Sequence, residues 1–272
     1  MAQLLRKTLR ALFDHDPSFC DMHDDPHAHA LSTEYLGHIR DHLHRRFGDR
    51  PLTILDAGCQ AGRLLVPLAQ DGHRMIGLDT SAFSLRRARR HAAALKLRVQ
   101  LRRGDIAQLR RWIEPASLDA VICTEVLYLC ENYRMLLELL AKSVKPGGVL
   151  FVSHRPTLYY VACAMKRGHP DQAAAMVQRR EGPSPDGEYH NWQTQEELVA
   201  LYREFTLQWL GCYPIDARPS RLNLSVTSDS DDDVRRLLEP TRDGDSTFRI
   251  PTYLLVVAQQ SGDADDRRFL RR

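Results

Sequence analysis

The sequence predicts a doubly wound α/β fold, in which helices cover both faces of one mostly parallel sheet of seven strands. From residue 52 onward, short apolar and β-branched runs alternate with longer runs of helical period, which is typical of repeated βα units. The run that begins at Leu118 is almost entirely apolar, as expected of a central strand buried on both faces. The length of 272 residues, with 43% hydrophobic and 27% charged residues, suits one compact domain.

Four strands are expected in the first half of the chain. The segment LTILDAG begins the series, and a helix from about Gly62 to Gln70 follows it. The second strand leads into a long helix that Thr80 or Ser81 caps, because either hydroxyl can accept a hydrogen bond from the first helical turn. The four strands are expected at residues 52–58, 74–79, 98–105 and 118–126.

Three further strands are expected in the second half. A helix over residues 133–144 ends at the segment KPGG, because proline cannot continue a helix and glycine permits the tight turn into the next strand. Thr194 and Glu197 form a T-x-x-E capping box, which predicts a helix that ends near Phe205. The three strands are expected at residues 148–154, 206–215 and 249–259.

The expected domain, residues 51–260, carries two insertions. A lid is expected at about 155–193, where the breaker GPSPDG interrupts regular structure. A second insertion at about 217–247 contains the acidic run Asp229–Asp233, which predicts a solvated loop with one short helix. Outside the domain, residues 1–50 are expected to form a helical cap and residues 261–272 a disordered tail.

Charge and composition indicate which kinds of partner and which cellular location are expected for this chain. The formal net charge of +3 comes from 38 basic and 35 acidic residues, so no chain-wide field attracts nucleic acid. The best apolar run, Leu118–Leu129, contains Asp119 and Glu125 and is shorter than the roughly 20 residues that span a bilayer. Six cysteines are scattered without a C-x-x-C pair. This favours reduced thiols and a cytoplasmic location.

Acidic and glycine residues follow the first predicted strand. Ligands of open α/β sheets bind beyond the carboxyl ends of the strands, so these positions are candidate contacts. Asp56 closes the strand, and Gly58 and Gly62 let the backbone turn sharply and approach a ligand closely. A glycine turn followed by the start of a helix is typical of a nucleotide-like cradle.

The next two predicted strands also end in aspartates. Asp79 can accept hydrogen bonds from two ribose hydroxyls. Asp105 can accept a hydrogen bond from an exocyclic adenine amine, while Ile106 offers an apolar surface to the ring. Together these strand ends favour an adenosyl ligand.

Five segments in succession resemble the motifs of one enzyme family. They are LDAGCQAGR, GLD, RGDI, LDAVICTEVLYL and KPGGVLFVSHR, within about residues 50–155. Together they resemble class I S-adenosylmethionine-dependent methyltransferases, particularly the small-molecule, type 11 group that resembles ubiquinone-biosynthesis methyltransferases. The resemblance implies a Rossmann-like sheet with an antiparallel last strand, S-adenosylmethionine as the cofactor, and a small-molecule methyl acceptor.

The resemblance also implies roles for individual residues. The loop after the first strand would shape the methionine end of the cofactor site, Asp79 would hold the ribose, and Asp105 with Ile106 would hold the adenine. Glu125 and its neighbours would line the pocket of the methyl donor. The expected cofactor contacts are Asp56, Gly58, Cys59, Gly62, Asp79, Thr80, Asp105, Ile106 and Glu125.

The sequence departs from the family in two places. Gln60 stands where the central glycine of the loop is usual, which weakens the inference of cofactor binding. Tyr128 and Leu129 stand where ubiquinone-type relatives often carry an acidic residue and a histidine. A divalent ion needs several convergent oxygen or nitrogen ligands, so no metal is expected there. The histidines at positions 23–29 lack the fixed spacing of zinc sites.

The residues on the acceptor side come from the later segments. His154 ends the fifth strand and is the candidate general base, since imidazole titrates near neutrality, although a structural hydrogen bond explains it equally well. The expected acceptor pocket consists of Tyr128, Tyr159, Tyr160 and His190. Tyr35, in the N-terminal cap, is a further candidate contact to the cofactor.

Other function classes remain to be weighed. A nicotinamide-dependent oxidoreductase would need the pattern G-x-G-x-x-G, which GCQAG does not supply. A nucleic-acid or protein methyltransferase stays an alternative, although TEVLYL lacks the Asn/Asp-Pro-Pro-aromatic clamp used on base amines. Gln60 motivates the third alternative, a non-catalytic binding module. The sequence leaves open the acceptor, whether oxygen, nitrogen or carbon is methylated, and the oligomeric state.

Overall fold

The structure is a computed structural model that describes residues 25–183, 187–221, 232–243 and 247–261. The expected tail, the first 24 residues of the expected cap, and parts of the GPSPDG and acidic segments lie outside these residues. The chain divides into two compact units. Unit 1 comprises Met1–Cys123 and Leu139–Leu150, and unit 2 comprises Thr124–Glu138 and Phe151–Arg272. The domain boundaries expected from the sequence stay a prediction.

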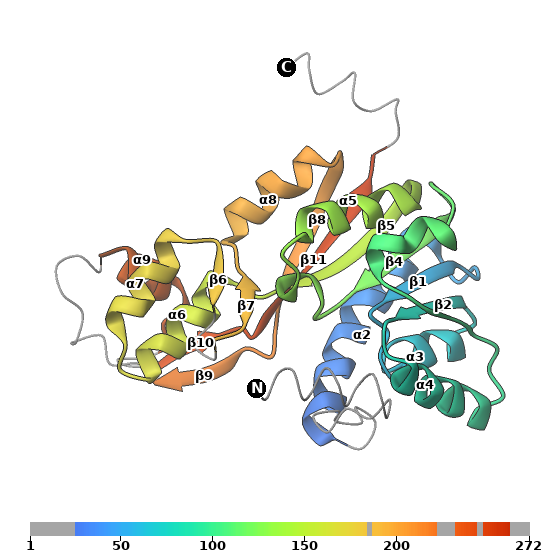
Figure 1. Cartoon of the computed structure of the whole chain (residues 1–272), viewed down its shortest axis with the longest axis horizontal. Coiled ribbons are helices and arrows are strands. Elements are labelled where there is room, and N and C mark those ends of the chain that lie inside the picture. Colours follow the sequence, from blue (N-terminus) through green and yellow to red (C-terminus); the bar gives the residue numbers. More distant parts are fainter. Residues whose placement is uncertain (1–24, 184–186, 222–231, 244–246, 262–272) are drawn as a thin grey trace, which may run out of the picture. The chain divides into compact units, whose positions relative to one another are not determined.

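A seven-stranded sheet has the order β3-β2-β1-β4-β5-β11-β8 (Figure 1). The pairs β1–β2, β2–β3 and β1–β4 are parallel, and β11 runs antiparallel to β8. The prediction of a mostly parallel sheet with an antiparallel last strand is therefore confirmed. The strands are β1 (Thr53–Ala57), β2 (Arg74–Asp79), β3 (Gln100–Arg103), β4 (Leu118–Cys123), β5 (Val144–His154), β8 (Leu207–Ile215) and β11 (Tyr253–Gln260).

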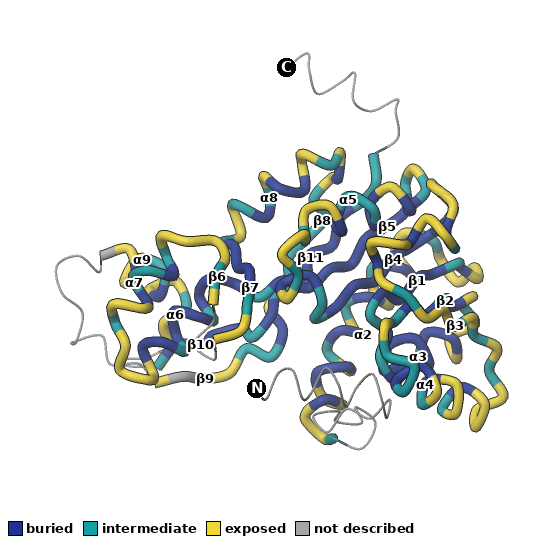
Figure 2. Tube along the Cα trace, in the orientation of Figure 1, coloured by how far each residue is buried: buried dark blue, intermediate teal, exposed yellow. Residues whose placement is uncertain are grey.

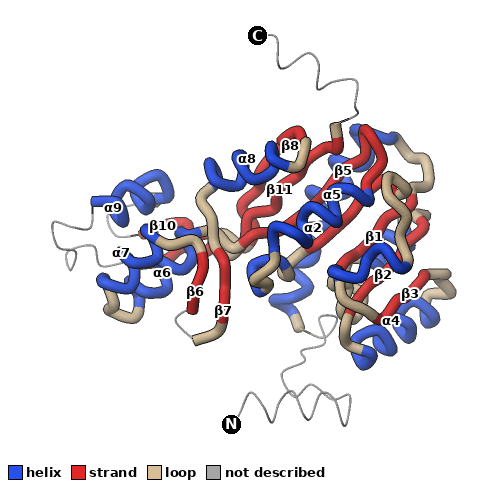
Figure 3. Tube along the Cα trace, turned by 45° about the horizontal axis from the view of Figure 1, so that its top comes forward, coloured by secondary structure: helices blue, strands red, loops and turns tan. Residues whose placement is uncertain are grey.

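In unit 1, two helices lie along the strands at one edge of the sheet. Helix α3 (Leu65–Gln70) contacts β2, and α4 (Ala82–Ala94) contacts β2 and β3. Figure 3 shows α4 beside these two strands. The strands β1 and β4 are buried along most of their length (Figure 2). Their apolar, β-branched residues satisfy the expectation of a strand covered on both faces.

Helix α2 (Pro26–Phe47) belongs to the expected N-terminal cap. Its first residue is proline, and the carboxylate of Asp25 accepts hydrogen bonds from the backbone N–H groups of His27 and Ala28. These features stabilise the start of the helix, because the first N–H groups have no partner within it.

Unit 2 contains the end of the large sheet, two small sheets and most of the later helices. Strands β6 (Glu181–Pro183) and β7 (Tyr189–Asn191) form an antiparallel pair, as do β9 (Arg218–Arg221) and β10 (Thr247–Ile250). Among the described residues, the 3-10 segments are η1 (Ile106–Arg111), η2 (Leu127–Leu129) and η5 (Glu239–Thr241). The remaining helices are α5 (Tyr133–Ser143), α6 (Thr157–Lys166), α7 (Pro170–Gln178), α8 (Gln195–Glu204) and α9 (Asp232–Leu238).

The second insertion differs from the expected loop. Besides the short helix α9, it contains β9 and β10, which pair with each other. Val234 and Leu238 on α9 are buried with Phe248 and Ile250 on β10 in one hydrophobic cluster. The expected short helix is thus present as α9, and the polar residues around these four positions concealed the paired strands and the buried residues beside it. The expected last strand is likewise divided into β10 and β11.

Three boundaries of strands and helices also differ from those that the sequence predicted. The third strand ends at Arg103 and not at Asp105, because Asp105 caps the segment η1. The fifth strand begins at Val144 and so includes the segment KPGG, in which Gly147 has a φ of 79°. Gly148 in this stretch lies close to its neighbours, and an added Cβ would lie 2.7 Å from the carbonyl oxygen of Asp119. Helix α3 starts three residues later than expected, after a turn.

Candidate functional site

The loop after β1 forms a tight turn in unit 1. The N–H groups of Gly58 and Cys59 donate to the carbonyl oxygen of Leu78 at 2.8 and 3.1 Å. Gly58 and Gly62 have φ values of 82° and 88°, in the left-handed region that glycine adopts without strain. Gln60 has a φ of 46°, although it is not a glycine. The departure of the sequence from the family therefore falls at a position that requires the left-handed conformation.

Asp79 at the end of β2 holds this turn in place. One carboxylate oxygen accepts a hydrogen bond from the N–H of Gln60 at 2.9 Å, and the other accepts one from the N–H of Ser81 at 2.8 Å. Burial raises the pKa of Asp79, and these backbone hydrogen bonds partly oppose the rise. Each carboxylate oxygen has two lone pairs, so both can still accept a hydrogen bond from a ribose hydroxyl.

Asp56 is the most buried carboxylate of the loop. It is 2% exposed, and burial raises its pKa to about 7, with Asp79 adding to the rise and the guanidinium of Arg63 opposing it. The Arg63 guanidinium also lies 5.6 Å from the ring centre of Tyr35 on α2. Tyr35 thus contacts a residue of the first loop, but its role toward a cofactor stays a prediction.

The third strand end is more open. The side chain of Asp105 is exposed, and one of its oxygens accepts a hydrogen bond from the N–H of Ala107 at 2.7 Å. Ile106 next to it is 6% exposed. Thr80 is exposed, and its carbonyl oxygen accepts a hydrogen bond from Arg103. Eight of the nine expected cofactor residues belong to unit 1, and Glu125 belongs to unit 2.

The chemistry of these groups fits S-adenosylmethionine. The cofactor carries a sulfonium cation, an ammonium group and two ribose hydroxyls. Asp56, Asp79 and Asp105 supply carboxylates that favour cations and accept hydrogen bonds. The glycine turn provides backbone close to a ligand without intervening side chains. Asp56 would shape the methionine end, Asp79 would bind the ribose, and Asp105 with Ile106 would bind the adenine.

In unit 2, Glu125 has an unusual backbone conformation. Its φ is 61°, and its N–H donates to the hydroxyl of Ser153 at 2.7 Å. A non-glycine residue in the left-handed region costs about 1–3 kcal/mol, and such residues cluster at functional sites. The hydroxyl of Ser153, on β5, holds Glu125 in this conformation.

Predicted acceptor residues come together around an arginine that the sequence analysis missed. The guanidinium carbon of Arg155 lies 4.5 Å from the ring centres of both Tyr128 and Tyr159 and 4.7 Å from that of Tyr253. Arg155 also donates to the hydroxyl of Tyr253 at 2.6 Å. One feature of the sequence could have pointed to Arg155, because it is a cationic residue that directly follows the apolar strand VLFVSH. Tyr253, near the C-terminal end of the chain, left no such signal.

Tyr160 and His190 belong to the same set of rings. The ring centre of Tyr160 is 5.5 Å from that of His190 and 5.0 Å from that of Trp192, and His190 is 5.5 Å from Tyr128. We refer to Arg155, Tyr128, Tyr159, Tyr160, His190 and Tyr253 as the Arg155 cluster. The structure thus brings all four expected acceptor residues into one cluster within unit 2, and their contact with an acceptor stays a prediction.

His154 is fully buried and makes a structural contact. Its Nε2 lies 2.9 Å from the hydroxyl of Tyr202 on α8, and the two rings meet edge to face. Burial lowers the pKa of His154 to about 3. An imidazole with so low a pKa is neutral but weakly basic, so these observations favour a structural role. The role of His154 as a general base stays a prediction.

Three other features bear on the site. Within the described ranges, no three His, Cys, Asp or Glu side chains are grouped so that they could hold a metal ion. None of the described helices is both long and apolar enough to cross a membrane. A cavity of about 290 Å³ in unit 2 is lined mainly by α7 and β6. Two of its lining residues contact the Arg155 cluster: Trp192 packs against Tyr160, and Gly182 pairs with His190 across β6 and β7.

Comparison with known proteins agrees with this geometry. Residues 54–148 match a family model described as a methyltransferase domain. The chain is 33% identical over 125 residues to a ubiquinone biosynthesis O-methyltransferase of Idiomarina loihiensis, covering 46% of this chain and 50% of that protein. It is 35% identical over 133 residues to the protein of the same description from Azorhizobium caulinodans, covering 46% and 52%. The chain therefore spans about half the length of the curated relatives that it matches.

Solved structures share the fold over more of the chain. A 1,6-didemethyltoxoflavin-N1-methyltransferase of Burkholderia thailandensis, with S-adenosylhomocysteine bound, superposes with a TM-score of 0.59 at 16% identity, covering 96% of this chain and 89% of that one. A magnesium protoporphyrin IX methyltransferase of Synechocystis with S-adenosylmethionine bound gives 0.57 at 16% identity, covering 95% and 96%. The resemblance to class I methyltransferases that the motifs predicted is confirmed, and the fold is that of this family.

Proposed function

We propose that this chain, whose residues 54–148 form a methyltransferase domain, transfers a methyl group from S-adenosylmethionine to a small-molecule acceptor. The observation that carries the proposal is the β1 loop, in which two glycines and Gln60 adopt left-handed backbone and Asp79 binds the Gln60 N–H. This turn is already closed, so binding a cofactor does not require the loop to order itself.

The chain contributes binding and orientation. The bound cofactor supplies an electrophilic methyl group on a sulfonium centre. Asp79 would orient the ribose, and the apolar side chain of Ile106 would exclude water from one face of the adenine. Holding an acceptor in a near-attack geometry supplies much of the rate acceleration in such a displacement. A general base is required only when the acceptor must lose a proton, so the proposal does not depend on His154.

The proposed class of methyl acceptor and the proposed cellular location are those expected from the sequence. A small molecule is favoured over nucleic acid, because the near-balance of 38 basic and 35 acidic residues gives no overall attraction for a polyanion. The curated relatives are named for ubiquinone biosynthesis, and the structural relatives for a toxoflavin precursor and a magnesium porphyrin. These names support an organic acceptor with conjugated rings. A cytoplasmic location belongs to the same proposal.

Calorimetric titration with S-adenosylmethionine and S-adenosylhomocysteine tests the cofactor site. We expect both to bind the wild type, and Asp79→Ala to weaken binding by about tenfold or more, since two charge-assisted hydrogen bonds are lost. The matched control is Asp71→Ala, which removes an exposed carboxylate paired with Arg40 in the same unit. Absence of binding by the wild type would overturn the proposal. Binding without turnover on any acceptor would favour the non-catalytic module instead.

A further inference from the structure

We propose that the Arg155 cluster binds a carboxylate group of the methyl acceptor, with Arg155 and Tyr160 as the donors and the tyrosine rings as walls for a flat ring. The inference rests on the proposed function, because it concerns the acceptor of that reaction. It assigns a substrate class, an aromatic or conjugated organic acid, and adds Arg155 and Tyr253 to the expected acceptor residues.

The charge of Arg155 has no counter-charge among the described residues. The side chain is partly buried, and no ion pair joins its guanidinium to an aspartate or glutamate in the described parts of the chain. Burial by itself lowers the pKa of Arg155, but four tyrosines around it raise the pKa above its usual value. A partly buried cation without a carboxylate partner is costly to the fold. An anionic ligand would supply the missing counter-charge.

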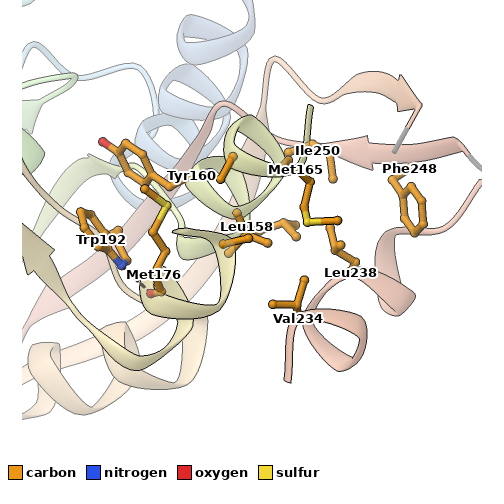
Figure 4. Close-up of a cluster of buried hydrophobic side chains, with 13 residues drawn as sticks. Leu158, Tyr160, Met165, Met176, Trp192, Val234, Leu238, Phe248 and Ile250 are labelled. Atoms are coloured by element: carbon orange, nitrogen blue, oxygen red, sulfur yellow. Dashed lines mark hydrogen bonds between the residues drawn. The ribbon is translucent and has the colours of Figure 1, made fainter. Parts of the chain in front are cut away.

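Two donors of the cluster also lack acceptors. The Nε of Arg155 and the hydroxyl of Tyr160 are buried and donate to no acceptor in the part of the chain that the structure describes, although the guanidinium and the hydroxyl interact with each other. Tyr160 is 1% exposed. Its hydroxyl points away from Leu158 and Met165 in the adjoining hydrophobic cluster (Figure 4). A buried polar group without a partner is uncommon in folded proteins, and two that neighbour each other suggest a shared ligand.

The two donors are close enough to act on one group. The guanidinium of Arg155 is the second-largest influence on the pKa of Tyr160, where it opposes the rise caused by burial. A carboxylate has about four acceptor sites on two oxygens, which suits the planar fork of a guanidinium together with one hydroxyl. A neutral acceptor would leave the charge of Arg155 without compensation.

The surroundings of the donors suit a flat, conjugated molecule. The rings of Tyr128, Tyr253 and His190 are tilted against one another at centre distances of 5.5 and 5.9 Å. Aromatic rings favour offset and edge-to-face contacts with another ring. After burial, the charge of Glu125 is the next cause of the raised pKa of Tyr253, so this side of the set faces a carboxylate of the chain itself. A carboxylate bound at Arg155 is therefore favoured on the side of Tyr160, away from Tyr253.

Paired probes that differ in one charge test the proposal. We would titrate the full chain with benzoate and with its neutral isostere benzamide, with S-adenosylhomocysteine present and absent. We expect the wild type to bind benzoate about tenfold more tightly than benzamide, as a charge-assisted hydrogen bond predicts. Arg155→Gln should abolish the preference. Arg134→Gln, which removes an exposed arginine paired with Glu204 in the same unit, should keep it.

The outcomes separate the inference from the proposed function. Equal binding of the two probes, no binding of benzoate, or a preference that survives in Arg155→Gln would overturn the carboxylate site. Binding of S-adenosylhomocysteine is measured in the same samples, so loss of the cofactor site is recognised independently. If Arg155→Gln fails to fold, Tyr160→Phe decides the question. It should weaken benzoate binding several-fold and leave benzamide binding unchanged, and an unchanged benzoate affinity would contradict the proposal.

Discussion

Two buried aspartates of unit 1 and two buried donors of unit 2 differ in their hydrogen bonding. In unit 1, Asp79 accepts two backbone hydrogen bonds, and Asp119 accepts one from the N–H of Thr53 and two from cationic side chains. In unit 2, the Nε of Arg155 and the hydroxyl of Tyr160 are buried and donate to no acceptor in the described residues, although another nitrogen of Arg155 donates to the hydroxyl of Tyr253. Satisfied groups stabilise a fold, whereas unsatisfied groups weaken it and are retained at binding sites. The contrast separates the loop that is proposed to bind the cofactor from the cluster that is proposed to bind the acceptor.

The largest effect is expected at the buried carboxyl of Asp56. Its pKa in the folded chain is about 7, above the usual value of 3.8 for an aspartate, so the folded state binds the proton more tightly than the unfolded state. The stability from this group is therefore fully present below about pH 4 and is lost as the pH rises through 7. Asp56→Asn should raise the free energy of unfolding by about 2–4 kcal/mol at pH 8 and have little effect at pH 4.

Urea denaturation at a series of pH values measures this effect. The control is Asp71→Asn, an exposed aspartate of the same unit, which should leave the pH dependence unchanged. If Asp56→Asn shows the same slope with pH as the wild type between pH 4 and 7, then Asp56 is not the group that causes it.

A smaller loss is expected at the satisfied aspartate of unit 1. Asp119 is 6% exposed and accepts hydrogen bonds from Thr53 N–H, Arg50 and Lys145 at 2.8, 3.1 and 3.1 Å. Burial by itself raises its pKa, but these three donors outweigh burial and lower it. Asp119→Ala should cost about 2 kcal/mol at neutral pH, discounted because both cations are half exposed.

The stability that Asp119 contributes changes with pH in the opposite direction to that of Asp56. A lowered pKa gives stability that is present above the usual aspartate pKa of 3.8 and is lost as the pH falls through the pKa of the folded state. The difference between Asp119→Ala and the wild type should therefore shrink in strong acid. A constant difference at all pH values would show that lost packing, and not the charge, causes the destabilisation.

The smallest effect is expected at the unsatisfied tyrosine of unit 2. Tyr160→Phe removes a hydroxyl that donates to no acceptor among the described residues, so the free energy of unfolding should change by less than about 0.5 kcal/mol. The matched control is Tyr202→Phe, which removes a buried hydroxyl bonded to His154 Nε2 at 2.9 Å and should cost about 1 kcal/mol. Thermal melting of both variants compares them directly, and equal losses would remove the contrast between satisfied and unsatisfied groups.

Local patterns in the sequence predicted much of the sheet and of the cofactor loop. The capping box of Thr194 and Glu197 is present, with both reciprocal hydrogen bonds formed, because its residues are three positions apart. The four βα boundaries that end near Asp56, Asp79, Asp105 and Glu125 were located to within a few residues. The strands and the buried residues of the insertion at 217–247 were not predicted. Its apolar residues pack against other elements, and their spacing in the sequence follows neither the helical nor the strand period.

The sequence by itself therefore determined the parallel sheet, the glycine turn after β1 and the carboxylates at the strand ends. These features depend on residues close together along the chain, where propensity and hydrogen bonding act directly. Only the tertiary structure decided that Arg155 meets Tyr128 from η2, Tyr160 from α6 and Tyr253 from β11. Contacts between residues so far apart leave no local pattern, because they form when the elements that carry the residues pack together.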